Sequence, residues 1–284
     1  MRGKSLSVED IILSRDRRGV SKLRQYMPEN YCDQAARLVL DSPNTAMIAT
    51  GFYISSASAI ETDGPPGAIA IGKALQAIGY EVMYVTDCYA APVMNSVLGE
   101  GFEVIEFPIL SDKASREFAQ KVLSEVDPSV LISIERCGMT REGLYRNMRD
   151  IDMSEHTARL DYLFLDHPKT IGIGDGGNEI GMGNLSSVIP TIDSLVKFPC
   201  VTKVNKLVIS SVSNWGGYGL AAALSKRVGK DVLISEEQEE ALVRHIVDEG
   251  AVDGVSGVNE YKIDGFTMRE SGEVITELHS FLDK

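Results

Sequence analysis

Residues 170–184 read Thr-Ile-Gly-Ile-Gly-Asp-Gly-Gly-Asn-Glu-Ile-Gly-Met-Gly-Asn, so an apolar, β-rich run passes directly into a polar loop, and the whole stretch contains six glycines. Glycine costs a helix or a strand about 0.5–1 kcal/mol relative to alanine, and it is used where the backbone takes unusual dihedral angles or lies against a ligand. The segment therefore predicts a short strand, Thr170–Ile173, followed by a loop. This loop is the first candidate for an active site.

Similar short β-rich runs alternate with helical patterns along the chain. The other predicted strands are Ala46–Thr50, Glu81–Thr86, Glu103–Phe107, Val130–Ile134 and Lys206–Ser211, and predicted helices include Gly67–Ile78, Ala114–Val126 and Gly219–Val228. This alternation is typical of a parallel sheet with crossover helices. We therefore expect a three-layer α/β fold, in which a doubly wound, mainly parallel sheet has helices on both faces. Residues 1–284 are expected to form a single α/β domain, with a helical segment at about 7–40 that flanks the sheet.

The composition argues against several functional classes. The formal net charge is −13, and no run of clustered Lys and Arg is present to bind a nucleic-acid backbone. The four cysteines lie far apart without a C-x-x-C pair, which favours a reducing compartment. No secretory signal is recognisable, and no apolar run approaches the about 20 residues of a membrane-spanning helix. We expect a cytoplasmic protein with a small-molecule substrate and no nucleic-acid or membrane partner; a homo-oligomer remains an open expectation.

Polar or glycine-rich segments follow five of the six predicted strands. In open α/β sheets, ligands bind beyond the carboxyl ends of the strands, near the point where the strand order reverses. The residues expected to converge at this edge are Glu61, Asp63 and Gly64 after the first strand, Asp87 after the second, Glu135 and Arg136 after the fourth, the Asp175 loop after the fifth, and Asn214 and Trp215 after the sixth.

Several of these residues also have simpler interpretations. Asp87 is by itself more simply a helix cap. Glu135 and Arg136 could form a solvated surface pair, worth at most about 1 kcal/mol. Trp215 is the only tryptophan and could fill the core, although Asn214 before it and two glycines after it favour a pocket wall.

The glycine loop also fits the dinucleotide fingerprint G-x-G-x-x-G at positions 172, 174 and 177. That match is weak, because Asp175 and Glu179 would place negative charge where a pyrophosphate needs free amides and a helix N-terminus. Dinucleotide binding is therefore the minority interpretation.

Three segments together resemble the D-glutamate cyclase-like family, long catalogued as a domain of unknown function. They are the ten-residue loop Gly174–Gly183, the stretch Glu61–Gly67 and the stretch Ser213–Gly217. The similarity extends from about Asp33 to the end of the chain. In vertebrate members this domain follows another large domain. The resemblance implies conversion of D-glutamate to 5-oxo-D-proline and water, formally a reversible hydro-lyase reaction.

The implied reaction requires a general base and a general acid, because the α-ammonium must lose a proton and the γ-carboxylate must be neutralised. Asp175 and Glu179 are the leading catalytic pair, with Asp175 as the base. The backbone amides of Gly176 and Gly177 and the carboxamide of Asn178 would stabilise the tetrahedral oxyanion.

A second set of residues would bind the substrate. Arg136 is the best-placed cation for the α-carboxylate, through a bidentate contact. Asp63, Asp87 or Glu135 would hold the amine. The predicted substrate-binding set is completed by Glu61, Gly64, Asn214 and Trp215.

The expected edge carries many carboxylates, namely Glu61, Asp63, Asp87, Glu135, Asp175 and Glu179. They would repel one another unless protonated, paired or bridged by a hard cation, so Mg²⁺ is a candidate cofactor that would also polarise the γ-carboxylate. Two further functions stay open: a metal-dependent hydrolase or transferase acting on a phosphorylated or nucleotide substrate, and a non-catalytic binder of a small acidic metabolite.

Overall fold

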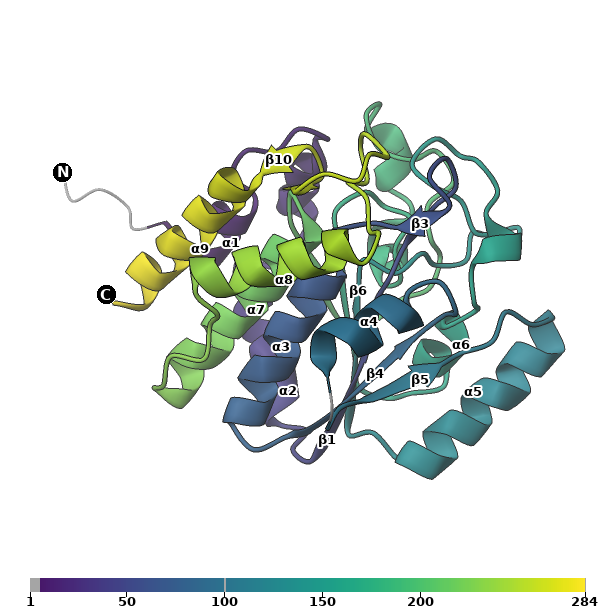
Figure 1. Cartoon of the computed structure of the whole chain (residues 1–284), viewed down its shortest axis with the longest axis horizontal. Coiled ribbons are helices and arrows are strands. Elements are labelled where there is room, and N and C mark those ends of the chain that lie inside the picture. The colour runs from purple at the N-terminus through teal and green to yellow at the C-terminus, as the bar shows by residue number, and fades with distance from the viewer. Residues whose placement is uncertain (1–5, 100, 284) are drawn as a thin grey trace.

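The computed structural model describes residues 6–99 and 101–283, which fold around a six-stranded sheet (Figure 1). Its strands are β1 (Thr45–Ala49), β4 (Glu81–Thr86), β5 (Glu103–Glu106), β6 (Val130–Ile134), β7 (Thr170–Gly174) and β8 (Lys206–Ile209). All neighbouring strands pair in parallel, in the order β5-β4-β1-β6-β7-β8. The predicted strands are confirmed, and their ends differ from the prediction by at most two residues.

The strand order reverses beside β1. The chain runs outward from β1 to β4 and β5, and then returns to β6 on the other side of β1. A ligand crevice is therefore expected at the carboxyl ends of β1 and β6. Two small antiparallel hairpins accompany the sheet, β2 (Tyr53–Ile54) with β3 (Ala59–Ile60), and β9 (Lys262–Ile263) with β10 (Phe266–Thr267).

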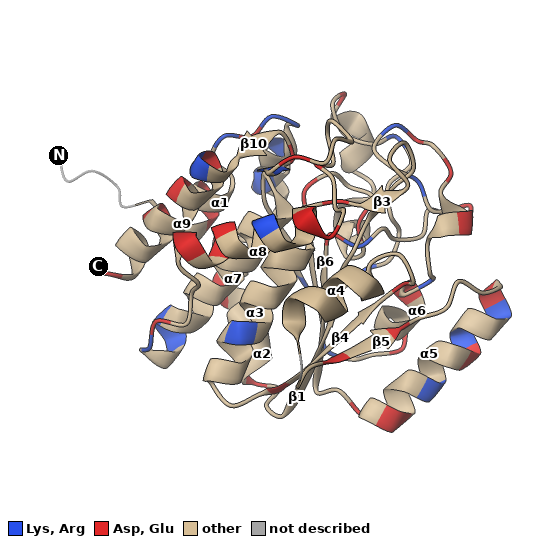
Figure 2. Cartoon of the chain, in the orientation of Figure 1, with Lys and Arg blue, Asp and Glu red and all other residues tan. Residues whose placement is uncertain are grey.

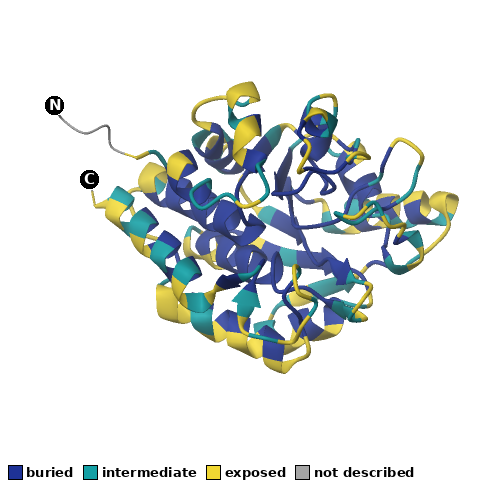
Figure 3. Ribbon diagram, turned by 90° about the horizontal axis from the view of Figure 1, so that it is seen from above, coloured by how far each residue is buried: buried dark blue, intermediate teal, exposed yellow. Residues whose placement is uncertain are grey.

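Helices cover both faces of the sheet, so the three-layer α/β prediction is confirmed (Figure 1). One face carries α2 (Tyr31–Leu40), α3 (Pro65–Ala77), α4 (Ala91–Leu98) and α7 (Ser213–Val228), and the other carries α5 (Asp112–Val126) and α6 (Asp161–Leu165). This division follows from right-handed crossovers, because the chain changes direction along the sheet after β5. Seen from above, the sheet and the helix surfaces against it are buried, and the outer surfaces are exposed (Figure 3).

The remaining helices extend this packing. α1 (Val8–Ile12) and α9 (Met268–Leu282) pack on α7, while α8 (Glu236–Asp248) packs on α9, α4 and α3. Short 3₁₀ helices occupy Val20–Tyr26, Ser154–His156, Met182–Leu185 and Ile189–Thr191. The predicted helical segment at 7–40 contains α1, a 3₁₀ helix and α2, but residues 13–19 form a loop between them. That loop carries a residue of the candidate site described below.

Helix α7 begins at Ser213, six residues before the predicted start at Gly219. The sequence analysis placed Asn214 and Trp215 in the segment that follows the sixth strand, and Gly216 and Gly217 have a low intrinsic helix propensity. In the folded protein these glycines allow close packing, since a Cβ at Gly217 would lie only 3.1–3.2 Å from the backbone of Gly67 in α3. The close approach of α3 and α7 therefore outweighs the local propensity.

Basic and acidic residues alternate along α5 (Figure 2). Two of these pairs, Lys113–Glu117 and Lys121–Glu125, are i,i+4 ion pairs with nitrogen–oxygen distances of 3.7 and 3.8 Å. Within residues 6–99 and 101–283, no helix combines the length and the apolar character needed to cross a membrane.

A buried polar chain joins α7, α8 and α9. Trp215 is fully buried, its Nε1 donates to Ser271 Oγ at 2.9 Å, and its ring centroid lies 4.8 Å from that of Phe266. Ser271 Oγ in turn donates to the carboxylate of Glu239, which is 1% exposed. The structure therefore places Trp215 in the core and not in the wall of a pocket.

Glu239 should make stability fall with rising pH. Burial raises its pKa from 4.5 to about 7, although the Ser271 and Tyr218 hydroxyls act in the opposite direction. The folded chain thus holds a proton that the unfolded chain loses above pH 4.5. The resulting stabilisation, at most about 3 kcal/mol, is complete below that pH and is lost as the pH rises through about 7.

We expect Glu239→Gln to flatten the pH dependence of unfolding between pH 5 and pH 8, because glutamine stays neutral and can still accept the Ser271 hydrogen bond. Urea unfolding at the two pH values measures the difference between variant and wild type. Glu240→Gln is the matched control, because Glu240 lies one residue on in the same helix and forms a partly exposed ion pair with Arg244. Equal pH slopes in wild type and Glu239→Gln would contradict the assignment.

Candidate active site

A cavity of about 420 Å³ opens at the carboxyl edge of the sheet. Its walls come from the β2–β3 hairpin, residues 147–151 and the loop 254–257, together with four charged or polar side chains, Arg18, Glu61, Glu135 and Asn178. Another hollow of about 480 Å³, between α5 and the β4–β5 edge, is lined by none of the predicted site residues. The cavity at the carboxyl edge is therefore the candidate site.

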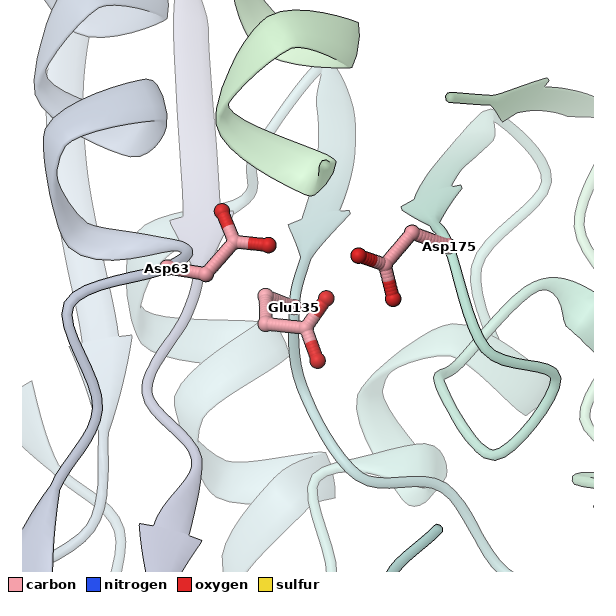
Figure 4. Close-up of side chains that lie close together, drawn as sticks. All are labelled: Asp63, Glu135 and Asp175. Carbon is pink, nitrogen blue, oxygen red and sulfur yellow. The ribbon is translucent and has the colours of Figure 1, made fainter. Parts of the chain in front are cut away.

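Glu135, at the floor of this cavity, lies close to two further carboxylates, Asp63 and Asp175 (Figure 4). Asp63 lies just before α3, Glu135 directly after β6, and Asp175 directly after β7. One oxygen of each lies within 4.8 Å of the others, and all three residues are at least 95% buried. The prediction that separate strand ends converge is confirmed for these residues.

Glu135 adopts an unusual backbone conformation, with φ at 43°. A non-glycine residue in this left-handed region costs roughly 1–3 kcal/mol, so the surrounding contacts must hold it there. Its carboxylate accepts a hydrogen bond from Ser213 Oγ at the start of α7 and also lines the cavity. The turn thus directs Glu135 toward Asp63 and Asp175 (Figure 4).

The carboxyl groups of the site share raised pKa values. Burial is the main cause for Glu61, Glu135 and Asp175, and repulsion from neighbouring carboxylates raises the pKa of each further. The pKa of Asp63 rises to about 8 through burial and the nearby Asp264, even though backbone amides oppose the rise. A carboxyl group with a raised pKa keeps its proton to higher pH than usual, which suits a group that must donate a proton.

Arg18 is the cation that pairs with carboxylates of the site among the described residues, and sequence reasoning missed it. Its Nη1 donates to Asp175, its Nη2 lies 2.7 Å from Asp264 Oδ1, and its side chain is 21% exposed. Burial opposes its charge, but Asp175 and Asp264 outweigh this and raise the pKa of Arg18 well above its usual value. The signal in the sequence was the run Arg15-Asp-Arg-Arg-Gly19, three arginines ending at a glycine in an acidic chain.

Glu179 organises the glycine loop from inside. Its carboxylate accepts hydrogen bonds from the backbone nitrogens of Asp175, Gly176 and Gly177 at 3.0, 2.6 and 2.7 Å. The amides predicted to form an oxyanion hole therefore already bind a carboxylate of their own loop. Asn178 does line the cavity, and its Nδ2 donates to the carbonyl oxygen of Arg146 at 3.0 Å.

Arg136 and Asp87 form a buried ion pair with a nitrogen–oxygen distance of 2.5 Å. Arg136 also donates to the carbonyl oxygens of Gly51 and Ala158, and it is 1% exposed. Asp87 accepts from the amide of Tyr89, in the turn that leads into α4. The interpretation of Arg136 as part of a solvated surface pair is thus wrong. Arg136, predicted to bind the substrate, instead connects the segments that contain Asp87, Gly51 and Ala158.

Asn214, Asp63 and Gly64 lock the N-termini of α3 and α7 together. Asn214 Oδ1 accepts from the amides of Gly64 and Gly67 at 2.9 and 2.8 Å, while Asp63 accepts from the amides of Ser213 and Asn214 at 2.8 and 2.7 Å. Asn214 is fully buried. This reciprocal capping fixes Asp63 beside Glu135 and gives Asn214 a structural position behind the cavity.

An acid-rich cavity where the strand order reverses is the place at which α/β proteins of this architecture commonly bind ligands. The family model described as D-glutamate cyclase-like, C-terminal, matches residues 8–279. The chain belongs to this family, and the match begins well before Asp33, where the resemblance was expected to start, so it includes Arg18.

Two individual proteins show the extent of the similarity. The chain is 32% identical over 286 aligned positions to the human protein named D-glutamate cyclase, mitochondrial, covering 86% of this chain but only 46% of the human protein. The chain thus spans about half the length of that relative. A crystal structure of an exopolyphosphatase-related protein from Bacteroides fragilis aligns with 89% of this chain and 57% of its own, with 14% identity and a TM-score of 0.41.

Proposed function

We propose that this protein interconverts D-glutamate and 5-oxo-D-proline plus water. The observation that carries the proposal is a cavity in a D-glutamate cyclase-like chain whose floor and walls hold buried carboxyl groups with raised pKa values beside Arg18. The substrate offers complementary groups, namely an ammonium for the carboxylates and a carboxylate for the arginine.

In the forward reaction the α-nitrogen forms a bond to the γ-carboxyl carbon, and one carbon–oxygen bond of that carboxyl breaks. The ammonium loses two protons, and both end on the departing oxygen as water, so atoms and charge balance. A carboxylate must therefore accept a proton from nitrogen while a carboxyl group delivers one to oxygen.

Glu61 is the base in this proposal. It lines the cavity, is 5% exposed, and makes no side-chain hydrogen bond or ion pair with any residue that the structure describes. An approaching ammonium stabilises its ionised form, because an opposite charge lowers the pKa of a carboxyl group. Protonated Glu135, at the floor, delivers a proton to the γ-carboxylate.

Arg18 takes the role that the sequence assigned to Arg136. Its guanidinium has five N–H donors, and Asp175 and Asp264 receive only part of them. The remaining donors can hold the α-carboxylate at the cavity wall. Asp175 orients Arg18 in this proposal, and Glu179 holds the loop that carries Asp175.

The test is to incubate the purified protein with each enantiomer of glutamate and of 5-oxoproline, and to follow interconversion by chiral chromatography. We expect turnover confined to the D series. Glu61→Gln should lower it by about 10²–10⁴-fold through loss of the base, whereas Glu103→Gln, at an exposed position of β5, should leave it unchanged. Thermal stabilisation by these compounds without turnover would instead favour a non-catalytic binder.

A further inference from the structure

We propose that Asp63, Glu135 and Asp175 together bind one hard divalent cation. The proposal rests on the same site as the proposed function and deepens it, because the cation would replace protons in neutralising the γ-carboxylate.

The three carboxylates have the spacing of a single-ion site. Their ligand oxygens all lie within 4.8 Å of one another. Opposite oxygens around Mg²⁺ or Mn²⁺ are about 4.2 Å apart, and around Ca²⁺ about 4.8 Å, if the metal–oxygen distances are about 2.1 and 2.4 Å. Three oxygens that are 4.8 Å apart lie about 2.8 Å from their common centre, so an ion of either size must draw them inward by at most about 0.4–0.7 Å.

The ligands are held in place by the fold. Asp63 is fixed by the amides of Ser213 and Asn214, and Glu135 by the hydroxyl of Ser213. Asp175 follows β7 directly and is anchored by Arg18. Because each carboxylate oxygen has more than one lone pair, these contacts leave room for a metal bond. Glu135 also lines the cavity, which gives an ion a route to the two deeper carboxylates.

A second observation points to a missing ligand. Asp175 is fully buried, yet its Oδ2 has no hydrogen-bond partner among the described residues. Glu61, which lines the same cavity as Glu135, is 95% buried and forms no side-chain hydrogen bond or ion pair within that part of the chain. Buried carboxylate oxygens without partners cost several kcal/mol, and a bound cation satisfies them.

The charges around the site also favour a cation. Arg18 is the cation that interacts with the carboxylates gathered here, which are Glu61, Asp63, Glu135, Asp175, Glu179 and Asp264. Amides compensate Asp63 and Glu179, and Arg18 pairs with Asp175 and Asp264. Glu61 and Glu135 form no direct ion pair with any cation of residues 6–99 and 101–283, although Arg18 acts on both from a greater distance. The positive N-terminal end of α7 opposes an added cation, but it carries only about half a charge.

The experiment titrates the EDTA-treated full chain with MnCl₂ and follows free Mn²⁺ by electron paramagnetic resonance. We expect saturable binding of one Mn²⁺ per chain, displaced by Mg²⁺ or Ca²⁺ according to which ion fits best. Glu135→Gln and Asp175→Asn should each weaken binding by at least about tenfold. The matched control Glu103→Gln, on the exposed edge strand β5, should bind as the wild type does.

Circular dichroism establishes that the compared variants are folded. If Glu135→Gln does not fold, the comparison of Mn²⁺ affinity uses Asp175→Asn alone. Absence of saturable Mn²⁺ binding by the wild-type chain, or equal affinity in the folded variants, would overturn the proposal. Turnover of D-glutamate by the EDTA-treated protein separates the two proposals, since activity without Mn²⁺ binding leaves the cyclase function standing and removes the metal site.

Discussion

Replacement of Glu135 by glutamine is expected to lower D-glutamate turnover by about 10³-fold, at the upper part of the range for losing a general acid–base group. Glutamine has nearly the same shape and can accept the hydrogen bond from Ser213 Oγ, so the turn after β6 should persist. It cannot deliver a proton, and it is a poor cation ligand. The loss should therefore appear in kcat, measured by chiral chromatography at saturating D-glutamate.

Two comparisons make this result specific. Glu103→Gln removes a carboxylate from an exposed strand position, and it should retain wild-type kcat. Thermal unfolding of both variants reports whether the fold is intact. A folded Glu135→Gln protein with wild-type kcat would show that this carboxyl group takes no part in the reaction.

Glu179→Gln is expected to destabilise the protein by about 2–4 kcal/mol, because hydrogen bonds to a buried charged group are worth about 1.5–3 kcal/mol each and are only partly replaced. The Glu179 carboxylate serves three backbone amides. A glutamine offers one oxygen, and its NH₂ group would face a donor. Activity should fall as well, because the loop carries Asp175.

Urea unfolding measures this effect, with Glu125→Gln on the exposed face of α5 as the control expected to change stability by less than about 0.5 kcal/mol. The result separates two roles for Glu179. An inactive Glu179→Gln protein that is as stable as the wild type would restore the catalytic role predicted from the sequence.

Much of the site's location followed from local pattern. Short β-rich runs predicted the strands, and parallel strands place their carboxyl ends at one edge. Glu61, Asp63, Glu135 and Asp175 could therefore be brought together without any knowledge of side-chain contacts. Their positions follow from the strands, and the strands can be predicted from the hydrophobic pattern of a single sequence.

The functions of the individual polar residues could not be assigned in the same way. Arg136 was predicted to bind the substrate because it follows a strand, but its guanidinium pairs with Asp87 and donates to two carbonyl oxygens. Arg18 looked remote, about 157 residues before Asp175, and yet the two form an ion pair. Which cation reaches the cavity depends on how the segment before α2 folds back over the sheet.

The sequence by itself determined the α/β architecture, the sheet edge that carries the candidate site and the family of the chain, because periodicity and a distinctive glycine loop are local properties. Tertiary structure alone decided which polar groups are satisfied internally and which remain free. Glu179, Arg136 and Asn214 are bound by protein partners, whereas Glu61 and Glu135 line the cavity and one oxygen of Asp175 has no hydrogen-bond partner among the described residues. The physical reason is that a buried polar group takes whichever partner the fold brings within hydrogen-bond distance, and most of these partners lie far away in the sequence.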